Sequence, residues 1–163
     1  NNWNKGLPRA DKDGDNWPLI RRIIVDPQAK PGSADIVAAK RRFLELLKIR
    51  SDSQLFQLDS AREVQRRLHF HNTGPEQLPG VIAFSLADNP REGRDLDRRY
   101  SALMVVINAS DKRVRLPAAD GYRLHPVLKA SVDPINRQAT VSNGMFEVPA
   151  FTTTVFVQPQ TRR

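Results

Sequence analysis

The second half of the chain is a succession of short apolar runs separated by turn residues, and this pattern restricts the possible folds more than any other feature. The runs begin after about residue 60. They are Arg62–Phe70, Val81–Leu86, Ala102–Ile107, Arg113–Leu116, Tyr122–Leu128, Ala139–Val141, Met145–Val148 and Thr153–Val157. Short strands at regular spacing, with turn residues between them, predict a mainly β fold built as an antiparallel β-sandwich.

Two details indicate how these strands pair and pack. Asn143-Gly144 lies between two runs, and both residue types tolerate the positive φ that a two-residue hairpin turn requires. The run Leu103–Ile107 is apolar at every position, which is typical of a strand buried on both faces. Because side chains alternate between the two faces of a strand, we expect one set to share the core. That set is Leu103, Val105, Ile107, Val155 and Val157.

The first part of the chain has helical periodicity instead. Ala34–Arg50 contains neither Pro nor Gly, and its apolar residues recur at helical spacing opposite a basic side. The apolar residues are Ile36, Val37, Phe43, Leu44, Leu46 and Leu47. Ser33 precedes this stretch and is a favoured N-cap residue. We therefore predict a helix over Ser33–Arg50.

Residues 1–33 are interrupted by Pro and Gly, which predicts an irregular segment. Within it, Asn16 followed by Trp17 and Pro18 favours the start of a short helix. We expect two parts in the chain, a loop-and-helix segment over 1–58 and an all-β domain over 59–163. A single helix with one apolar stripe cannot close a core, so it must pack on the sandwich or on a body outside this chain. We expect Phe43, Leu44 and Leu47 to pack towards the sandwich.

The net charge of +8 raises nucleic acid as a partner, because phosphate binding depends on Lys and Arg. The excess is scattered as separate Arg pairs, however, with no long basic block, which favours a solvated Arg-rich surface. We expect no nucleic-acid partner. The absence of cysteine excludes disulfides and thiolate ligands, and no apolar run approaches the ~20 residues of a membrane-spanning helix, so no membrane partner is expected.

Two patterns could bind a metal ion, and both are weak. Asp11, Asp13 and Asp15 resemble the first half of an EF-hand loop, but the Gly and the bidentate Glu that such a loop requires are missing. An acidic turn in water is the better interpretation, although a calcium site stays open. His69 and His71 share one strand face and His125 could join them, yet exposed histidines explain the pattern as well. We expect neither a metal site nor a cofactor.

Three stretches resemble one known family, and together they cover almost the whole chain. Residues 1–8, NNWNKGLP, are similar to the loop after the eighth barrel strand of pullulanase-type α-1,6-glucosidases, which belong to the α-amylase family of (β/α)₈ barrels. Residues 43–56, FLELLKIRSDSQLF, resemble the final barrel helix and its exit. Residues 121–128, GYRLHPVL, and 146–157, FEVPAFTTTVFV, resemble the last strands of the C-terminal β-sandwich of that family.

This resemblance implies a function for a longer protein. Such enzymes hydrolyse α-1,6 linkages in starch, glycogen, pullulan or limit dextrin, with catalytic Asp and Glu residues on barrel strands that come before the opening loop. We therefore expect this chain, which starts at Asn1, to follow the catalytic barrel in the same polypeptide and to lack the catalytic carboxylates, so that it is inactive alone. The resemblance also places the opening loop at the rim of the glucan cleft, and it implies a substrate-binding role for Asn1, Asn2, Trp3 and Asn4.

Two alternatives remain at this stage. A free-standing carbohydrate-binding sandwich would need a row of exposed aromatic side chains on one sheet face. A basic nucleic-acid-binding domain would show binding that weakens steeply with salt. Trp17 could likewise offer its ring to a sugar or pack on the base of its own loop.

Overall fold

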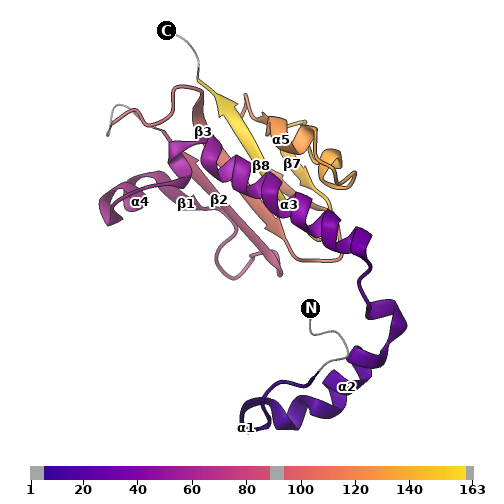
Figure 1. Ribbon diagram of the computed structural model, residues 1–163. Coiled ribbons are helices and arrows are strands. Elements are labelled where there is room, and N and C mark those ends of the chain that lie inside the picture. The colour runs from indigo at the N-terminus through magenta and orange to yellow at the C-terminus, as the bar shows by residue number, and fades with distance from the viewer. Residues whose placement is uncertain (1–5, 89–93, 161–163) are drawn as a thin grey trace. The chain divides into compact units, whose positions relative to one another are not determined.

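The structure is a computed structural model that describes residues 6–88 and 94–160 (Figure 1). By its internal contacts the chain forms two compact units, residues 1–40 and residues 41–163. Each unit is described by itself below. The expected boundary between residues 58 and 59 rests on the sequence alone and stays a prediction. None of the helices in the described ranges is long and apolar enough to cross a membrane.

The first unit is a series of short helices that leads into a long one. It contains α1 (Ala10–Asp13), η1 (Gly14–Asn16), α2 (Trp17–Val25), η2 (Pro27–Ala29) and the first turns of α3 (Ser33–Asp52). The predicted short helix is therefore present, with Pro18 in its first turn. Asn16 precedes it but makes no capping hydrogen bond, because its own backbone is helical rather than extended (φ −87°, ψ −7°).

The predicted long helix is present as α3, with a different start. Ser33 is its first helical residue rather than its cap. The carboxylate of Asp35 accepts a hydrogen bond from the N–H of Gly32, with 2.8 Å between nitrogen and oxygen. This contact satisfies an N–H that the helix itself leaves free, and it places a negative charge at the positive end of the helix dipole. The helix continues past Arg50 to Asp52.

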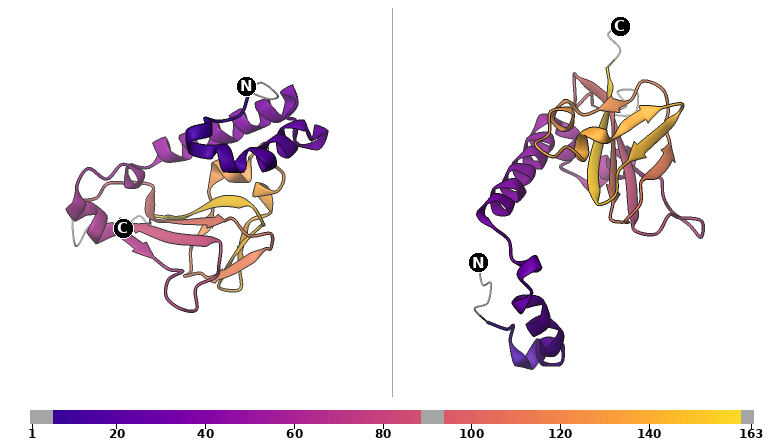
Figure 2. Two further views of the ribbon diagram at one scale, coloured as in Figure 1. Left: turned by 90° about the horizontal axis from the view of Figure 1, so that it is seen from below. Right: turned by 90° about the vertical axis from the view of Figure 1, so that its right-hand side faces the viewer.

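The second unit is built on two antiparallel sheets, as the sequence predicted (Figures 1 and 2). The larger has the order β1-β2-β3-β8-β5 and the smaller β4-β7-β6. The strands are β1 (Leu68–Phe70), β2 (Val81–Ala87), β3 (Tyr100–Asn108), β4 (Val114–Pro117), β5 (Arg123–Leu124), β6 (Thr140–Ser142), β7 (Met145–Val148) and β8 (Thr152–Pro159). Strand β3 is the central strand of the larger sheet and pairs with β2 and β8.

The hairpin predicted at Asn143-Gly144 is confirmed. These two residues connect β6 to β7, with Ser142 opposite Met145 in the register. Both adopt positive φ, 50° for Asn143 and 69° for Gly144. This backbone matches the twist of the two strands, and Asn and Gly are the residue types that accept it most readily.

The larger sheet is buried on both faces, each by a different part of the chain. One face packs against the smaller sheet, where Met104 and Phe156 meet Phe146 and Val148. The other face is covered by the C-terminal part of α3, η3 (Gln54–Phe56) and α5 (Pro126–Lys129), which lie on that side of the strands in Figure 2. These three elements contribute buried apolar residues, which are Ile49, Leu55 and Leu128.

The residues predicted to share a core face α3 rather than the second sheet. Leu103 and Val157 pack with Leu55, and Val105 and Val155 pack with Ile49. Ile107 is half-buried at the edge of the same region. The other four are buried as expected. The layer between the two sheets, however, is formed by the alternate residues of the same strands, such as Met104 and Val106, whose side chains point to the opposite face.

Two predicted strands are wrong over most of their length. Most of Arg62–Phe70 is the helix α4 (Ala61–Arg67), and only Leu68–Phe70 is a strand. The hydroxyl of Ser60 accepts from the N–H of Glu63 at 3.3 Å and starts this helix as an N-cap. Similarly, Tyr122–Leu128 contains the short strand β5 and then α5, which has Pro126 in its first turn and the ring of His125 accepting from the N–H of Val127 at 3.2 Å.

Candidate functional site

The four residues predicted to bind substrate, Asn1, Asn2, Trp3 and Asn4, lie outside the described residues. Their role stays a prediction. The other aromatic candidate, Trp17, packs on its own loop: its indole N–H donates to the carbonyl of Pro8 at 2.9 Å. The guanidinium of Arg21 lies over its ring, 5.5 Å from the centroid. One face of this ring is therefore occupied by a cation, which favours the packing interpretation over a sugar platform.

The carboxylates considered for calcium lie on short helices. Asp11 and Asp13 belong to α1, Asp15 belongs to η1, and Asp11 forms an ion pair with Arg9 at 2.7 Å. His69 and His71 are exposed neighbours with ring centroids 4.8 Å apart, whereas His125 is buried. Across residues 6–88 and 94–160, no group of three or more His, Asp or Glu side chains is placed to hold a metal ion.

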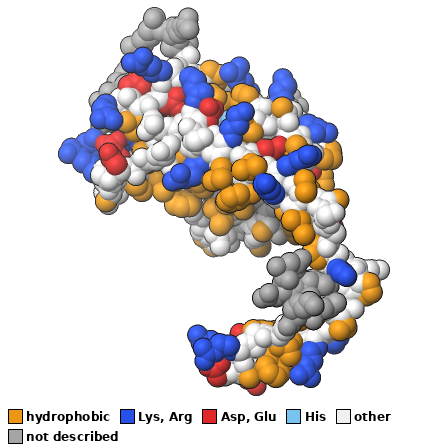
Figure 3. All heavy atoms as spheres, in the orientation of Figure 1, with side chains coloured by type: hydrophobic (Ala, Val, Ile, Leu, Met, Phe, Trp, Pro, Cys, Tyr) orange, Lys and Arg blue, Asp and Glu red, His pale blue; other side chains and the backbone are white. Residues whose placement is uncertain are grey.

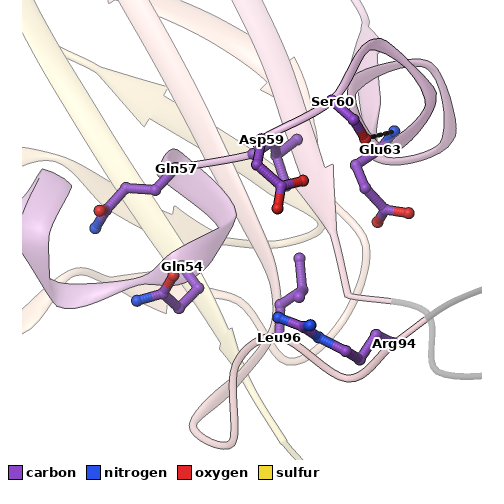
Figure 4. Close-up of a pocket in the computed structure, with 8 residues that line it drawn as sticks. Gln54, Gln57, Asp59, Ser60, Glu63, Arg94 and Leu96 are labelled. Carbon is purple, nitrogen blue, oxygen red and sulfur yellow. Dashed lines mark hydrogen bonds between the residues drawn. The ribbon is translucent and has the colours of Figure 1, made fainter.

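A polar pocket of about 240 Å³ lies beside α4 (Figure 4). It brings together Asp59, Glu63 and Arg94, with Leu96 at its wall. A hydrogen bond from Arg67, and the charge of Arg67 and Arg66, hold the pKa of Glu63 below its ordinary value. Retaining glycoside hydrolysis needs one carboxyl group that stays protonated, and Glu63 is held in the opposite state. The arrangement is therefore unsuited to acid catalysis by Glu63.

Next to this pocket, the buried guanidinium of Arg67 ties α4 to the larger sheet. It donates to Glu63 Oε2 and to Asp88 Oδ1, both at 2.6 Å, and to the carbonyl of Arg94 at 2.5 Å. Asp88 in turn accepts from the N–H of Asp97 at 2.7 Å. Sequence reasoning missed this network, although Ser60-x-x-Glu63 is a capping-box pattern and Arg67 stands four residues beyond Glu63.

Polar contacts also fix the C-terminal part of α3 to the sandwich. Glu45 accepts from the hydroxyl of Ser131 and from the N–H of Val132, both at 2.7 Å. Arg42 forms an ion pair with Asp133. Asp52 accepts from Arg99 at 2.9 Å and lies 3.4 Å from Nε2 of His125. These contacts and the buried Ile49 share one stripe of the helix, Arg42, Glu45, Ile49 and Asp52, at spacings of three and four residues.

This stripe overturns one sequence interpretation. Phe43, Leu44 and Leu47 do not pack towards the sandwich as their apolar character suggested. Phe43 is 61% exposed and Leu47 is 44% exposed. Because the helix presents the stripe of Arg42, Glu45, Ile49 and Asp52 to the sheet, these neighbouring positions point away from it.

The outer side of α3 is consequently apolar, and we call Phe43, Leu44 and Leu47 the outer helix face. All three are at least 44% exposed. Figure 3 shows hydrophobic side chains gathered along this side of the β domain. On the sheet face that α3 partly covers, Phe70 and Ile82 are also exposed, and they line an apolar groove of about 450 Å³. Contiguous exposed apolar surface is characteristic of an interaction site.

The sequence and the fold both have known relatives. The family described as alpha-1,6-glucosidases, pullulanase-type, C-terminal, matches residues 1–159. Pullulanase 1, chloroplastic, of Arabidopsis thaliana is 43% identical over 167 residues, covering 97% of this chain and 17% of that protein. Pullulanase of Klebsiella pneumoniae is 30% identical over 164 residues, covering 98% of this chain and 15% of that protein. The crystal structure of apo pullulanase from Klebsiella pneumoniae superposes on the whole chain with a TM-score of 0.83 and 29% identity, and the match covers 18% of it.

The chain thus spans less than a fifth of the length of these relatives. The family match extends from the opening loop through β8, so it includes the helices as well as both sheets. The resemblance in the three sequence stretches, the two antiparallel sheets and the family match agree: this chain belongs to the family of pullulanase-type α-1,6-glucosidase C-terminal domains.

Proposed function

We propose that this chain is the C-terminal part of a starch-debranching enzyme, in which it stabilises a catalytic (β/α)₈ barrel that precedes it in the same polypeptide. In that enzyme the substrate is an α-glucan such as pullulan or limit dextrin, and the reaction is hydrolysis of its α-1,6 linkages with retention at the anomeric carbon. The chain itself contributes no catalytic carboxylate.

The observation that carries this proposal is the division of α3 into two sides. Its inner stripe is fixed to the sandwich by Glu45, Arg42, Asp52 and the buried Ile49. Its outer helix face is left uncovered by the second unit. A helix held this firmly, with exposed Phe and Leu side chains on the other side, is suited to bind a second apolar body.

Burial of the outer helix face would stabilise the joined structure substantially. Complete burial of one Leu or Phe side chain is worth roughly 1.5–3 kcal/mol, and the three residues of this face are all at least 44% exposed. The helix α3 would then contact the barrel with its outer face and the sandwich with its inner stripe. Because the sandwich has a core of its own, it would hold α3 in place and so stabilise the barrel surface that α3 covers.

The test is made on the complete polypeptide that contains this chain. The double substitution Phe43→Glu/Leu47→Glu places two charges on the outer helix face and should lower the melting temperature of the complete enzyme by several degrees. Val64→Glu, at an exposed apolar position of α4, serves as the matched control and should leave it unchanged. Equal melting temperatures for both variants would refute the docking role.

The inactivity of the chain alone is tested separately. The purified 163-residue chain is incubated with pullulan, and reducing ends are assayed against a heat-inactivated sample. No release above that background is expected, since retaining hydrolysis needs two carboxyl groups about 5 Å apart in opposite protonation states. Sustained release by the chain alone would show that a catalytic pair lies within it.

A further inference from the structure

A second pocket, of about 170 Å³, lies between α3, η4 (Asn136–Gln138) and the start of β8. Its lining includes Arg42, Glu45, Asn136, Phe151 and Thr153. Sites that enclose drug-sized ligands have volumes of roughly 300–1,000 Å³, so this one has room for a single ring rather than a long molecule.

Phe151 stands at this pocket in an unusual state. Its side chain is 69% exposed, and its backbone has a φ of 51°. A bulky residue rarely adopts this left-handed conformation, and such outliers concentrate where a ligand is held. The N–H of Phe151 donates to the carbonyl of Ser110 at 3.1 Å, which fixes the turn. The fold therefore presents an aromatic ring to solvent at a position where glycine would be easier to accommodate.

Asn136 supplies the second unusual feature. Its side chain is only 9% exposed, and its carboxamide oxygen makes no hydrogen bond within the described residues. Buried polar groups almost always have a partner, and this oxygen has none although it is closed to solvent, so a ligand would reach it by a small opening of the pocket wall around Asn136. A carboxamide both donates and accepts hydrogen bonds, which matches the hydroxyl groups of a polyol.

The charges around the pocket favour a neutral ligand. Arg42 is paired with Asp133, and both carboxylate oxygens of Glu45 already accept hydrogen bonds, from Ser131 and Val132. The charge of Arg42 is already balanced by Asp133, and the carboxylate of Glu45 would repel a phosphate or carboxylate ligand. The ligand chemistry that fits is a neutral ring with hydroxyl groups at its edge and an apolar C–H face that packs on an aromatic side chain.

We propose that this pocket binds one glucosyl ring of an α-glucan, with Phe151 against the face of the ring and Asn136 hydrogen-bonded to its hydroxyls. The choice of an α-glucan among sugars rests on the proposed function of the longer enzyme. The pocket would be a surface site that holds the glucan chain and takes no part in hydrolysis. A single shallow contact predicts weak binding, with a dissociation constant on the order of 1–10 mM.

The experiment is a titration of the 163-residue chain with maltotriose, followed by amide NMR. The expected result is saturable shifts that include the Asn136 side-chain amide. Phe151→Gly removes the ring and suits the positive φ, so it should keep the fold, as checked by its melting temperature, while weakening binding at least tenfold. Asn136→Ala should also weaken binding. Phe70→Ala, an exposed phenylalanine in the apolar groove, should leave the affinity unchanged.

Two results would overturn the proposal. These are no saturable binding of maltotriose and unchanged affinity in both pocket variants. If the pocket instead receives a protein segment, Phe151→Gly will destabilise the complete enzyme and the isolated chain will not bind maltotriose. Because the titration needs no catalytic barrel, its failure is distinct from failure of the proposed debranching function.

Discussion

Strand β3 and helix α3 are both rich in large apolar residues, yet those of β3 are mostly buried and those of α3 are mostly exposed. Seven of the nine residues of β3 are buried, because the strand has the smaller sheet on one side and α3 on the other. Of the twenty residues of α3, all within the described range, only Ile49 is buried. The contrast separates apolar residues that hold this domain together from apolar residues that are available to another surface.

The largest expected effect comes from the buried side of this comparison. Leu103→Ala in β3 removes a side chain with 0% exposure, so it should lower the free energy of unfolding by about 2–5 kcal/mol. The matched change Leu47→Ala, on the outer helix face, should cost less than about 0.5 kcal/mol in the isolated chain. Urea denaturation of both variants measures the difference. Similar losses would mean that α3 is not open on its outer side.

A smaller effect is expected where the two regions are joined. Glu45→Ala leaves the hydroxyl of Ser131 and the N–H of Val132 without their acceptor, which should cost about 1–3 kcal/mol. Amide hydrogen exchange should also accelerate in residues 41–52 more than in residues 100–108. Glu76→Ala, an exposed carboxylate in the loop before β2, is the control. Unaltered exchange in residues 41–52 would show that the apolar contact of Ile49 holds α3 without Glu45.

A pH dependence is expected at the same junction. Burial lowers the pKa of His125 below its ordinary value of 6.5, and the charge of Asp52 opposes this only in part. The folded state therefore favours neutral imidazole. The stability that this provides is present above about pH 6.5 and is lost as the pH falls from there towards the folded pKa.

Unfolding free energies at several pH values between about 7.5 and 5 test this sign. His125→Gln should flatten part of the profile, while His69→Gln should alter only the part that His71 contributes, because the charge of His69 helps to lower the pKa of His71. His71 also has a lowered pKa, through partial burial and its neighbour His69, so some slope should remain. Stability that rises as the pH falls would contradict the assignment.

The smallest effect on stability is expected on the outer helix face. Phe43→Glu together with Leu47→Glu should change the unfolding free energy of the isolated chain by no more than about 0.5 kcal/mol. In sedimentation experiments the wild-type chain should associate as its concentration rises, because exposed apolar patches promote association. The double variant should stay monomeric over the same concentrations. A wild-type chain that is monomeric at all concentrations would mean that the outer helix face does not mediate self-association.

Much of the fold could be predicted from local pattern. The β3 run, the Asn143-Gly144 turn and the extent of α3 were all recognisable, because each depends on residues close together in sequence. Some errors were also local. Ser60-x-x-Glu63 indicates a helix start, and His125-Pro126 indicates another, yet the runs Arg62–Phe70 and Tyr122–Leu128 as a whole predict strand. Burial on both faces was visible in β3, but the partner of each face was not.

The candidate sites were less predictable. The pocket beside η4 depends on the strained φ of Phe151 and on the orphaned oxygen of Asn136. These are properties of backbone geometry and burial that no residue pattern displays. The substrate-binding role of Asn1, Asn2, Trp3 and Asn4 rests on resemblance alone.

The sequence by itself determined the two-sheet class, the long helix and the family. Only the tertiary structure decided which side of α3 meets the sheet. Phe43, Leu44 and Leu47 form the more apolar side, but the helix turns its stripe of Arg42, Glu45, Ile49 and Asp52 inward. There, Ser131, Val132, Asp133 and Arg99 offer partners for the three polar residues of that stripe. Those partners lie some fifty to ninety residues away in sequence. Because Ser131 and Asp133 are buried, and a buried polar group is stable only when paired, their position in space fixed the orientation of the helix.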